Sequence, residues 1–415
     1  MNPLHLTFSD GSGGADRAAL RLHQAMLQQG VASRMQVALK ERNDPAIEGS
    51  RSEWQRSMLF NRSRVASVGL RLQRPADHNP RSLALLPSGR VHRLNREHAD
   101  LLHFHWICGE MLSVEDIGRL RKPLVWTLHD MWPFCGAEHY ATDGPEARWR
   151  HGYTTANRPA AQRGLDLDRW VWQRKQRAWR RPIHLVAPSQ WMADCARASA
   201  LMHDWPVRVI PNPLALNAFR PVPQPLARQL LNLPPDQPLV LFGAIGGGQD
   251  QRKGWDLLQA TLAQLAGTMP NVAGVIFGQT QPPAPPRLGL PLYWMGHMHD
   301  DLSLALLYSA CDVMVVPSRL DNLPQTGTEA QACGCPVVAF NVGGLPSVVE
   351  HQQTGYLAQP FAIDDLAAGI AWVLESAERQ QRLAAQARAR AERLWAPEVV
   401  VAQYREVYQR ALGAG

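Results

Sequence analysis

Short apolar runs alternate with longer amphipathic segments along most of the chain. The first run, Leu4 to Phe8, precedes a polar loop with glycines, after which apolar residues recur at helical spacing up to Gly30. Val31 to Leu39 forms the next apolar run. A strand, a glycine loop, a helix and a second strand make a βαβ unit, whose two strands are parallel. The pattern therefore predicts an α/β fold around a parallel sheet.

The same alternation continues on both sides of a proline-rich segment. Five prolines fall between Pro211 and Pro225, a density that stiffens a linker and excludes a long helix. We therefore expect an N-terminal domain at 1–212, a linker at 213–225 and a C-terminal domain at 226–394. The remaining residues, 395–415, form an apolar terminal helix that must pack on another part of the protein. Predicted strands are at 99–106, 123–128, 183–187, 207–210, 239–242, 272–277, 292–295, 313–316 and 336–340, and predicted helices at 302–308, 328–332 and 364–393.

Composition agrees with a folded chain of two or three domains. The 415 residues are 45% hydrophobic and 19% charged, which excludes global disorder. The net charge of +7 suits an anionic small molecule, a lipid surface or a nucleic acid. A nucleic-acid partner is not expected, because the basic residues do not cluster with an RNA- or DNA-binding signature.

The six cysteines are scattered and form no CxxC pair, so neither a zinc ribbon nor a disulfide framework is predicted. The N-terminus lacks the features of a signal peptide, and no apolar run approaches the roughly 18 residues that cross a bilayer. We therefore expect a cytoplasmic protein with reduced thiols.

One segment suggests contact with a membrane. Residues 51–75 carry six arginines against a single acid, Glu53, with apolar residues at helical spacings between them. This pattern predicts a basic amphipathic helix or helix pair. It either presents a solvated face or docks on the anionic inner face of a membrane. Residues 141–181, rich in Arg and Trp, are expected to include an excursion over the surface.

Two glycine loops stand between a strand and a helix, where backbone N–H groups can approach an anion. The first contains Gly13 and Gly14; it matches neither a dinucleotide fingerprint nor a P-loop, and a simple tight turn is the alternative. The second, at 243–248, is followed by Arg252 and Lys253. Two cations after such a loop suit a diphosphate, whereas a solvated basic turn is the alternative.

Candidate polar residues follow predicted strands in both halves. Asp321 and Glu329 stand eight residues apart, after a strand and inside the next helix, at the edge where parallel sheets bind ligands. Spacing alone leaves coincidence as the alternative. His129 ends a strand of the first half, and His103 and His105 are rival histidines that share one strand face.

Taken together, these motifs resemble one family. The sequence is similar to glycosyltransferases of family 4, in the branch of colanic-acid and other exopolysaccharide enzymes. The resemblance implies the GT-B fold, with two Rossmann-like α/β domains that face a central cleft and a C-terminal helix that crosses back to the N-terminal domain. The motifs that carry it are the segments at 126–134, 187–191, 209–213, 252–254 and 321–336.

The resemblance also implies roles for individual residues. His129, Asp321 and Lys253 correspond to residues near the transferred sugar and the diphosphate, and Glu329 to the acid that holds the nucleotide ribose. One departure concerns the clamp, because Gly246 to Gly248 stand where the family usually has a Gly-Arg pair. The implied donor-binding residues are Gly13, Gly14, Arg252, Lys253, Asn322, Leu323, Pro324, Gln325, Thr326 and Glu329.

The implied activity is transfer, with retention, of a sugar from a nucleotide-diphosphate sugar to a glycan or lipid-linked acceptor in cell-surface polysaccharide synthesis. The family needs no cofactor and no obligatory metal, and the leaving phosphate serves as base for the acceptor hydroxyl. Alternatives are an epimerase or phosphorylase of the GT-B fold, or an inactive protein that binds sugar nucleotides. Hydrolysis of the donor without acceptor would exclude the inactive protein.

Overall fold

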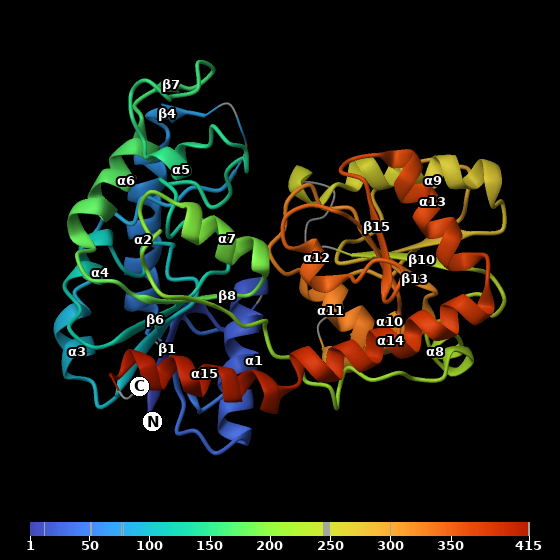
Figure 1. Ribbon diagram of the computed structural model, residues 1–415, viewed down its shortest axis with the longest axis horizontal. Coiled ribbons are helices and arrows are strands. Elements are labelled where there is room, and N and C mark those ends of the chain that lie inside the picture. Colours follow the sequence, from blue (N-terminus) through green and yellow to red (C-terminus); the bar gives the residue numbers. More distant parts are fainter. Residues whose placement is uncertain are drawn as a thin grey trace. The chain divides into compact units, whose positions relative to one another are not determined.

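The computed structural model describes residues 1–11, 13–49, 52–75, 77, 79–243, 250–298 and 300–413. They divide into two compact units, Met1–Asn212 with residues from Val401 onward, and Pro213–Val400. Each unit contains a parallel sheet with helices around it (Figure 1). The predicted fold class, two Rossmann-like α/β domains, is therefore confirmed.

In the first unit a seven-stranded parallel sheet has the order β3-β2-β1-β5-β6-β8-β9. Its strands are β1 (Pro3–Ser9), β2 (Arg34–Leu39), β3 (Ile47–Glu48), β5 (Leu101–Phe104), β6 (Leu124–Thr127), β8 (His184–Ala187) and β9 (Val207–Val209). The helices are α1 (Gly14–Gln28), α2 (Glu53–Leu70), α3 (Val91–Arg96), α4 (Val114–Gly118), α5 (Arg148–His151), α6 (Leu167–Ala178) and α7 (Gln190–Ala198), and β4 (Gln73–Arg74) pairs with β7 (Arg163–Gly164).

The second unit repeats this plan with a six-stranded parallel sheet of order β12-β11-β10-β13-β14-β15. Its strands are β10 (Leu239–Gly243), β11 (Ala273–Phe277), β12 (Leu292–Trp294), β13 (Val313–Val316), β14 (Val337–Phe340) and β15 (Gly355–Ala358). Its helices are α8 (Gln224–Leu230), η1 (Gln251–Lys253), α9 (Trp255–Thr268), α10 (Asp301–Ala310), α11 (Gln325–Ala332), α12 (Leu345–Val348), α13 (Ile363–Leu374) and α14 (Ala377–Trp395).

Strand β10 shows why this second sheet is buried on both sides. Leu239 and Leu241 pack in one apolar cluster with residues of α10 and α11, while Val240 and Phe242 pack in another with α9 and α13. Successive strand residues point to opposite faces, so a strand that is apolar at every position needs cover on both.

The last helix, α15 (Pro397–Ala411), begins in the second unit and ends in the first. Tyr404 and Tyr408 are buried, and their hydroxyls lie 2.9 Å from Thr127 Oγ1 and 2.7 Å from His103 Nδ1. The apolar side of the terminal segment thus packs on the first sheet, at the strands β5 and β6.

One local prediction differs from the structure. The single helix expected at 364–393 is two helices, α13 and α14, because the Ser376 hydroxyl accepts a hydrogen bond from Arg379 N and caps a new helix. The region 141–181 includes exposed stretches, as predicted, and also two fully buried side chains, Trp149 and Lys175. The glycine-rich loop at 243–248, with Gly246 to Gly248, lies outside the described residues apart from Gly243.

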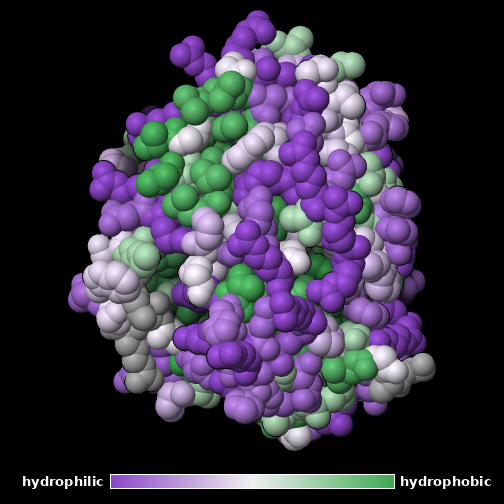
Figure 2. All heavy atoms as spheres, turned by 90° about the vertical axis from the view of Figure 1, so that its left-hand side faces the viewer, coloured by the Kyte–Doolittle hydropathy of each residue, from purple (hydrophilic) through white to green (hydrophobic). Residues whose placement is uncertain are grey.

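Helix α2 confirms the predicted helix within 51–75 and leaves large apolar side chains in solvent. Trp54 is 70% exposed and Phe60 64% exposed, and Val68 is 60% exposed. Figure 2 shows hydrophobic residues gathered in the upper left part of this face of the molecule. None of the helices in the described part of the chain combines the length and the apolar composition that a membrane crossing requires.

Candidate functional site

The two cations after the second glycine loop are held beside the loop that follows β13. Arg252 and Lys253 lie in the short 3₁₀ helix η1, whose C-cap residue, Gly254, has a φ of +70°. A Cβ at this position would stand 1.9 Å from Pro317 O, so only glycine allows the close approach. Arg319 N also donates to Arg252 O at 2.8 Å, which joins the two loops.

This junction brings Lys253 and Asp321 together, although 68 residues separate them. Lys253 Nζ lies 2.7 Å from Asp321 Oδ2, and Arg252 Nη1 lies 3.8 Å from the same oxygen. Burial by itself would raise the pKa of Asp321, but Lys253 and Arg252 hold this pKa below its ordinary value. Asp321 is therefore a carboxylate at neutral pH. Asp250 Oδ2 also pairs with Arg252 Nη2 at 2.9 Å, so each of the two cations already has an acidic partner.

The residues after Asp321 lead into the N-terminus of α11. Asn322 N donates to Asp321 Oδ1 at 3.0 Å, and Pro324 stands at the N-cap position. Gln325 and Thr326 occupy the first turn and are partly exposed. The positive end of the helix dipole therefore lies in the same loop as the Lys253–Asp321 pair, an arrangement that favours an anion.

Glu329 lies one turn further along α11 and is only 2% exposed. Its Oε2 accepts a hydrogen bond of 2.8 Å from the hydroxyl of Tyr308 in α10. The structure thus places Glu329 on the buried side of its helix. Its role with a nucleotide ribose stays a prediction.

The first glycine loop has a buried acid at the start of its helix. Gly13 and Gly14 stand at the start of α1, but Asp16 accepts hydrogen bonds there from Thr7 Oγ1 at 2.9 Å and from Ser9 N at 3.4 Å. Burial raises the pKa of Asp16 to about 6. This acid therefore stands at the helix N-terminus beside the two glycines, whose donor-binding role stays a prediction.

His129 follows β6 in the first unit, as predicted, and its ring is bonded to another histidine. His129 Nε2 lies 3.0 Å from His105 Nδ1, and His105 Nε2 lies 3.0 Å from His5 Nδ1. Burial lowers the pKa of His129 to about 4. His105 was the alternative to His129 as the functional histidine at the end of a strand, and in the structure the two rings contact each other.

The segment after His129 is held by buried polar contacts. Asp130 Oδ2 accepts from Trp106 Nε1 at 2.9 Å and lies 2.5 Å from His139 Nδ1. Lys175 Nζ donates to the carbonyls of Trp132, Cys135 and Gly136. Burial lowers the pKa of Lys175 to about 7. These contacts fix the backbone that carries His129, and sequence reasoning did not identify His139 or Lys175.

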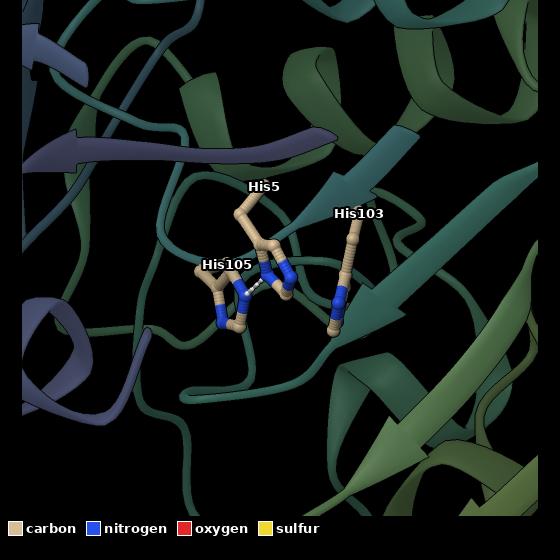
Figure 3. A group of neighbouring side chains, drawn as sticks. All are labelled: His5, His103 and His105. Atoms are coloured by element: carbon tan, nitrogen blue, oxygen red, sulfur yellow. Dashed lines mark hydrogen bonds between the residues drawn. The ribbon is translucent and has the colours of Figure 1, made fainter. Parts of the chain in front are cut away.

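His5, His103 and His105 form the one group of three in the described residues whose geometry invites a metal (Figure 3). Their ligand atoms lie within 4.8 Å of one another. However, both nitrogens of His103 already meet hydroxyls, at 2.7 Å from Tyr408 and 2.8 Å from Thr127. A metal needs a bare nitrogen from each ligand, so this donor set does not fit one. The six cysteines are all free and buried.

Comparison with known proteins places these features in context. The family model for glycosyl transferases group 1 matches residues 228–390, and the model for glycosyltransferase family 4 matches residues 12–217. A D-inositol 3-phosphate glycosyltransferase from Thermobispora bispora is 31% identical over 335 residues, which cover 75% of this chain and 71% of the relative. A protein of the same description from Segniliparus rotundus is 33% identical over 183 residues, or 42% of this chain and 40% of the relative. The chain thus spans well under two thirds of the length of this second relative.

Solved structures share the fold over nearly the whole chain. Sucrose-phosphate synthase from Thermosynechococcus elongatus has a TM-score of 0.68 and 21% identity and covers 100% of both chains. HepE of Anabaena in complex with UDP-glucose has a TM-score of 0.66 and 19% identity, and covers 99% of this chain and 100% of its own. At such identities the similarity concerns the fold.

Proposed function

Because the chain belongs to the glycosyltransferases of group 1 and family 4, we propose that it transfers a sugar from a nucleotide-diphosphate sugar to an acceptor hydroxyl. The observation that carries the proposal is the convergence of Lys253, Arg252 and the N-terminus of α11 at one loop. Sugar transfer leaves negative charge on the departing diphosphate, and preorganised cations and helix N–H groups stabilise such charge.

We place the diphosphate on the second unit. Lys253 has a side chain that is 24% exposed while its ammonium contacts Asp321, so it is held in place and still reachable. Asp321 would orient Lys253 and, through its second oxygen, accept from a sugar hydroxyl. The acidic residue Asp16 at the first glycine loop supports this assignment, because like charge there would repel a phosphate.

The reaction is proposed to retain the configuration of the sugar, with the leaving phosphate taking the acceptor proton. His129 would then contact the transferred sugar or the acceptor from the first unit. Its low pKa supports a neutral imidazole at this position, which donates or accepts a hydrogen bond without carrying charge.

The acceptor is proposed to be a glycan or a lipid-linked sugar for cell-surface polysaccharide. Helix α2 supports a lipid-linked acceptor, because it exposes Trp54 and Phe60, and the guanidinium of exposed Arg64 lies over the Phe60 ring at 5.8 Å from its centroid. Apolar and basic groups together bind the interface of an anionic membrane. A second candidate acceptor is an inositol phosphate, which the descriptions of the relatives favour.

The proposal is tested by a donor screen followed by a transfer assay. UDP-, GDP-, ADP- and dTDP-sugars are added to the full chain, starting with UDP-glucose, and the shift in melting temperature identifies the donor that binds the folded state. The selected donor is then incubated with an inositol phosphate or with lipid-linked acceptor, and the released nucleotide and glycosylated product are measured. A donor that binds but is neither transferred nor hydrolysed would leave an inactive sugar-nucleotide-binding protein.

A further inference from the structure

Three histidines of the first unit form a continuous chain of ring-to-ring contacts. His129 meets His105 and His105 meets His5, each through a nitrogen–nitrogen distance of 3.0 Å. The neighbouring rings are stacked, with centroids 5.3 Å apart in both pairs. The chain runs from the end of β6 into the core between the sheet and its covering helices.

The topology of the sheet explains this alignment. Strand β5 lies between β1 and β6, and His5 stands opposite His103 in the register. Side chains two residues apart share one face of a strand, so His103 and His105 point the same way as His5. His23 of α1 and Tyr404 and Tyr408 of α15 face this group, with ring centroids 6.0 Å apart for His5 and His23.

The three imidazoles that contact one another, those of His5, His105 and His129, are neutral at physiological pH. Burial lowers the pKa of His5 and of His105 well below the ordinary value, and nearby histidines lower both further. A neutral imidazole has one N–H and one bare nitrogen. Each of the two histidine–histidine contacts therefore needs one donor and one acceptor. Because each ring has a single N–H, the direction of donation in one contact determines the direction in the other.

His5, at the buried end of the three histidines, determines the direction in which the N–H groups donate. His5 Nε2 is fully buried and has no hydrogen-bond partner within the described part of the protein. If it carried the proton, an N–H group would be buried without an acceptor, which is rarer in native structures than an unsatisfied acceptor. The proton of His5 therefore belongs on Nδ1, which donates to His105 Nε2, and His105 Nδ1 in turn donates to His129 Nε2.

We propose that His105 and His5 are positioning residues for His129, and that they hold it as the tautomer with its proton on Nδ1. With Nε2 committed to accepting from His105, His129 offers a substrate oxygen a hydrogen bond and takes no proton from the acceptor. The inference rests on the proposed function only for the position of His129 near the transferred sugar. No proton changes place at His129, and the acceptor proton goes to the leaving phosphate.

The direct test is nitrogen NMR of the full chain labelled with ¹⁵N-histidine, without substrate at pH 7.5. The signals of His129 are assigned by their loss in His129→Asn. In the wild type we expect a protonated Nδ1 and a bare Nε2 for His129. In His105→Phe, which removes the donor, the pattern should shift toward a protonated Nε2. A wild-type His129 with its proton on Nε2, or a pattern that His105→Phe leaves unchanged, would overturn the inference.

The matched control is His23→Asn, which removes a buried histidine of the same face that bonds Ser33 and lies outside the chain. It should leave the His129 signals and the turnover number unchanged. If His105→Phe does not fold, the wild-type spectrum still decides the direction, and His5→Phe tests the chain from its inner end.

Kinetics then separate positioning from a merely structural role. With the donor found in the screen, His105→Phe should lower kcat by about tenfold to a hundredfold, as loss of a supporting hydrogen bond does elsewhere. The KM for the donor should change less than twofold. An equal loss in His23→Asn would show a structural role only. If the wild type turns over no sugar nucleotide, the proposed function fails, while the NMR result still stands or falls by itself.

Discussion

The two units share one architecture and differ in what their sheets bury. In the second unit the central strands β10 and β13 contribute Leu, Val and Met to two apolar clusters. In the first unit the neighbouring strands β1 and β5 bury His5, Thr7 and His103, and His105 is buried directly after β5. The same βα plan thus tolerates a hydrogen-bonded core as well as an apolar one, provided that the polar groups find partners.

The loops at the sheet edges differ in charge as well. At the first glycine loop the buried groups are acidic, and Asp10 and Asp16 accept backbone hydrogen bonds there. At the second, Arg252 and Lys253 converge on Asp321. The comparison teaches that equivalent loops of one fold need not share a charge pattern: buried acids lie at the first loop, and two cations paired with acids lie at the second.

The largest effect expected from this difference is acid sensitivity of the first unit. Burial lowers the pKa of His23 and His129 to about 4 and places those of His5, His103 and His105 well below the ordinary value. An unfolded histidine, with a pKa near 6.5, binds a proton as the pH falls from 6.5 to 4, whereas these folded ones stay neutral. Each then lowers the free energy of unfolding by up to about 1.4 kcal/mol per pH unit.

We therefore expect the first unit to unfold before the second as the pH drops below 6.5. Limited proteolysis at pH 7.5 and pH 5, followed by mass spectrometry, locates the first cuts. Early cuts between residues 213 and 400 at pH 5 would contradict the comparison.

The second largest effect is expected on turnover, when the cation Lys253 after the second glycine loop is removed. Lys253→Ala should lower kcat by about 10²–10³, the effect of removing one preorganised group that stabilises transition-state charge. Turnover is measured with the donor found in the screen. Lys122→Ala, which removes a lysine that donates to Ala99 O in the first unit, is the control. Equal turnover in both variants would remove Lys253 from the mechanism.

Removal of a single hydroxyl from the hydrogen-bonded core of the first unit should lower the free energy of unfolding moderately. Tyr408→Phe leaves His103 Nδ1 without its 2.7 Å partner, and an unsatisfied buried polar group costs about 1–3 kcal/mol. The free energy of unfolding is measured by urea denaturation. Tyr293→Phe in the second unit removes only a 3.4 Å contact with Gln237 and should have a much smaller effect. Similar decreases in the free energy of unfolding for the two variants would contradict the difference between the two cores.

The smallest effect on stability belongs to α2. The double variant Trp54→Ser and Phe60→Ser should change the free energy of unfolding by less than about 0.5 kcal/mol, because both side chains are exposed. It should nevertheless reduce co-sedimentation with anionic vesicles several-fold at low salt. Leu302→Ser, at a 67% exposed leucine of the second unit, is the control. Undiminished sedimentation of the double variant would leave α2 as a solvated helix.

Much of the fold was predictable because local periodicity is set by residues close in sequence. The strands around Leu241, Val275 and Val315 and the helix within 51–75 all follow from apolar spacing. The break between α13 and α14 escaped, although Ser376 is a recognisable N-cap. Apolar spacing runs on across this break, and only the capped backbone shows where one helix ends.

The candidate site divides in the same way. The residue types and their positions after strands, at His129, Lys253 and Asp321, were determined by the sequence alone. The tertiary structure decided that Lys253 pairs with Asp321 across 68 residues and that His5 bonds His105 across 100. Such contacts depend on which strands become neighbours and in what register. That choice is made by the free energy of packing whole sheets and helices, which no local pattern of residues contains.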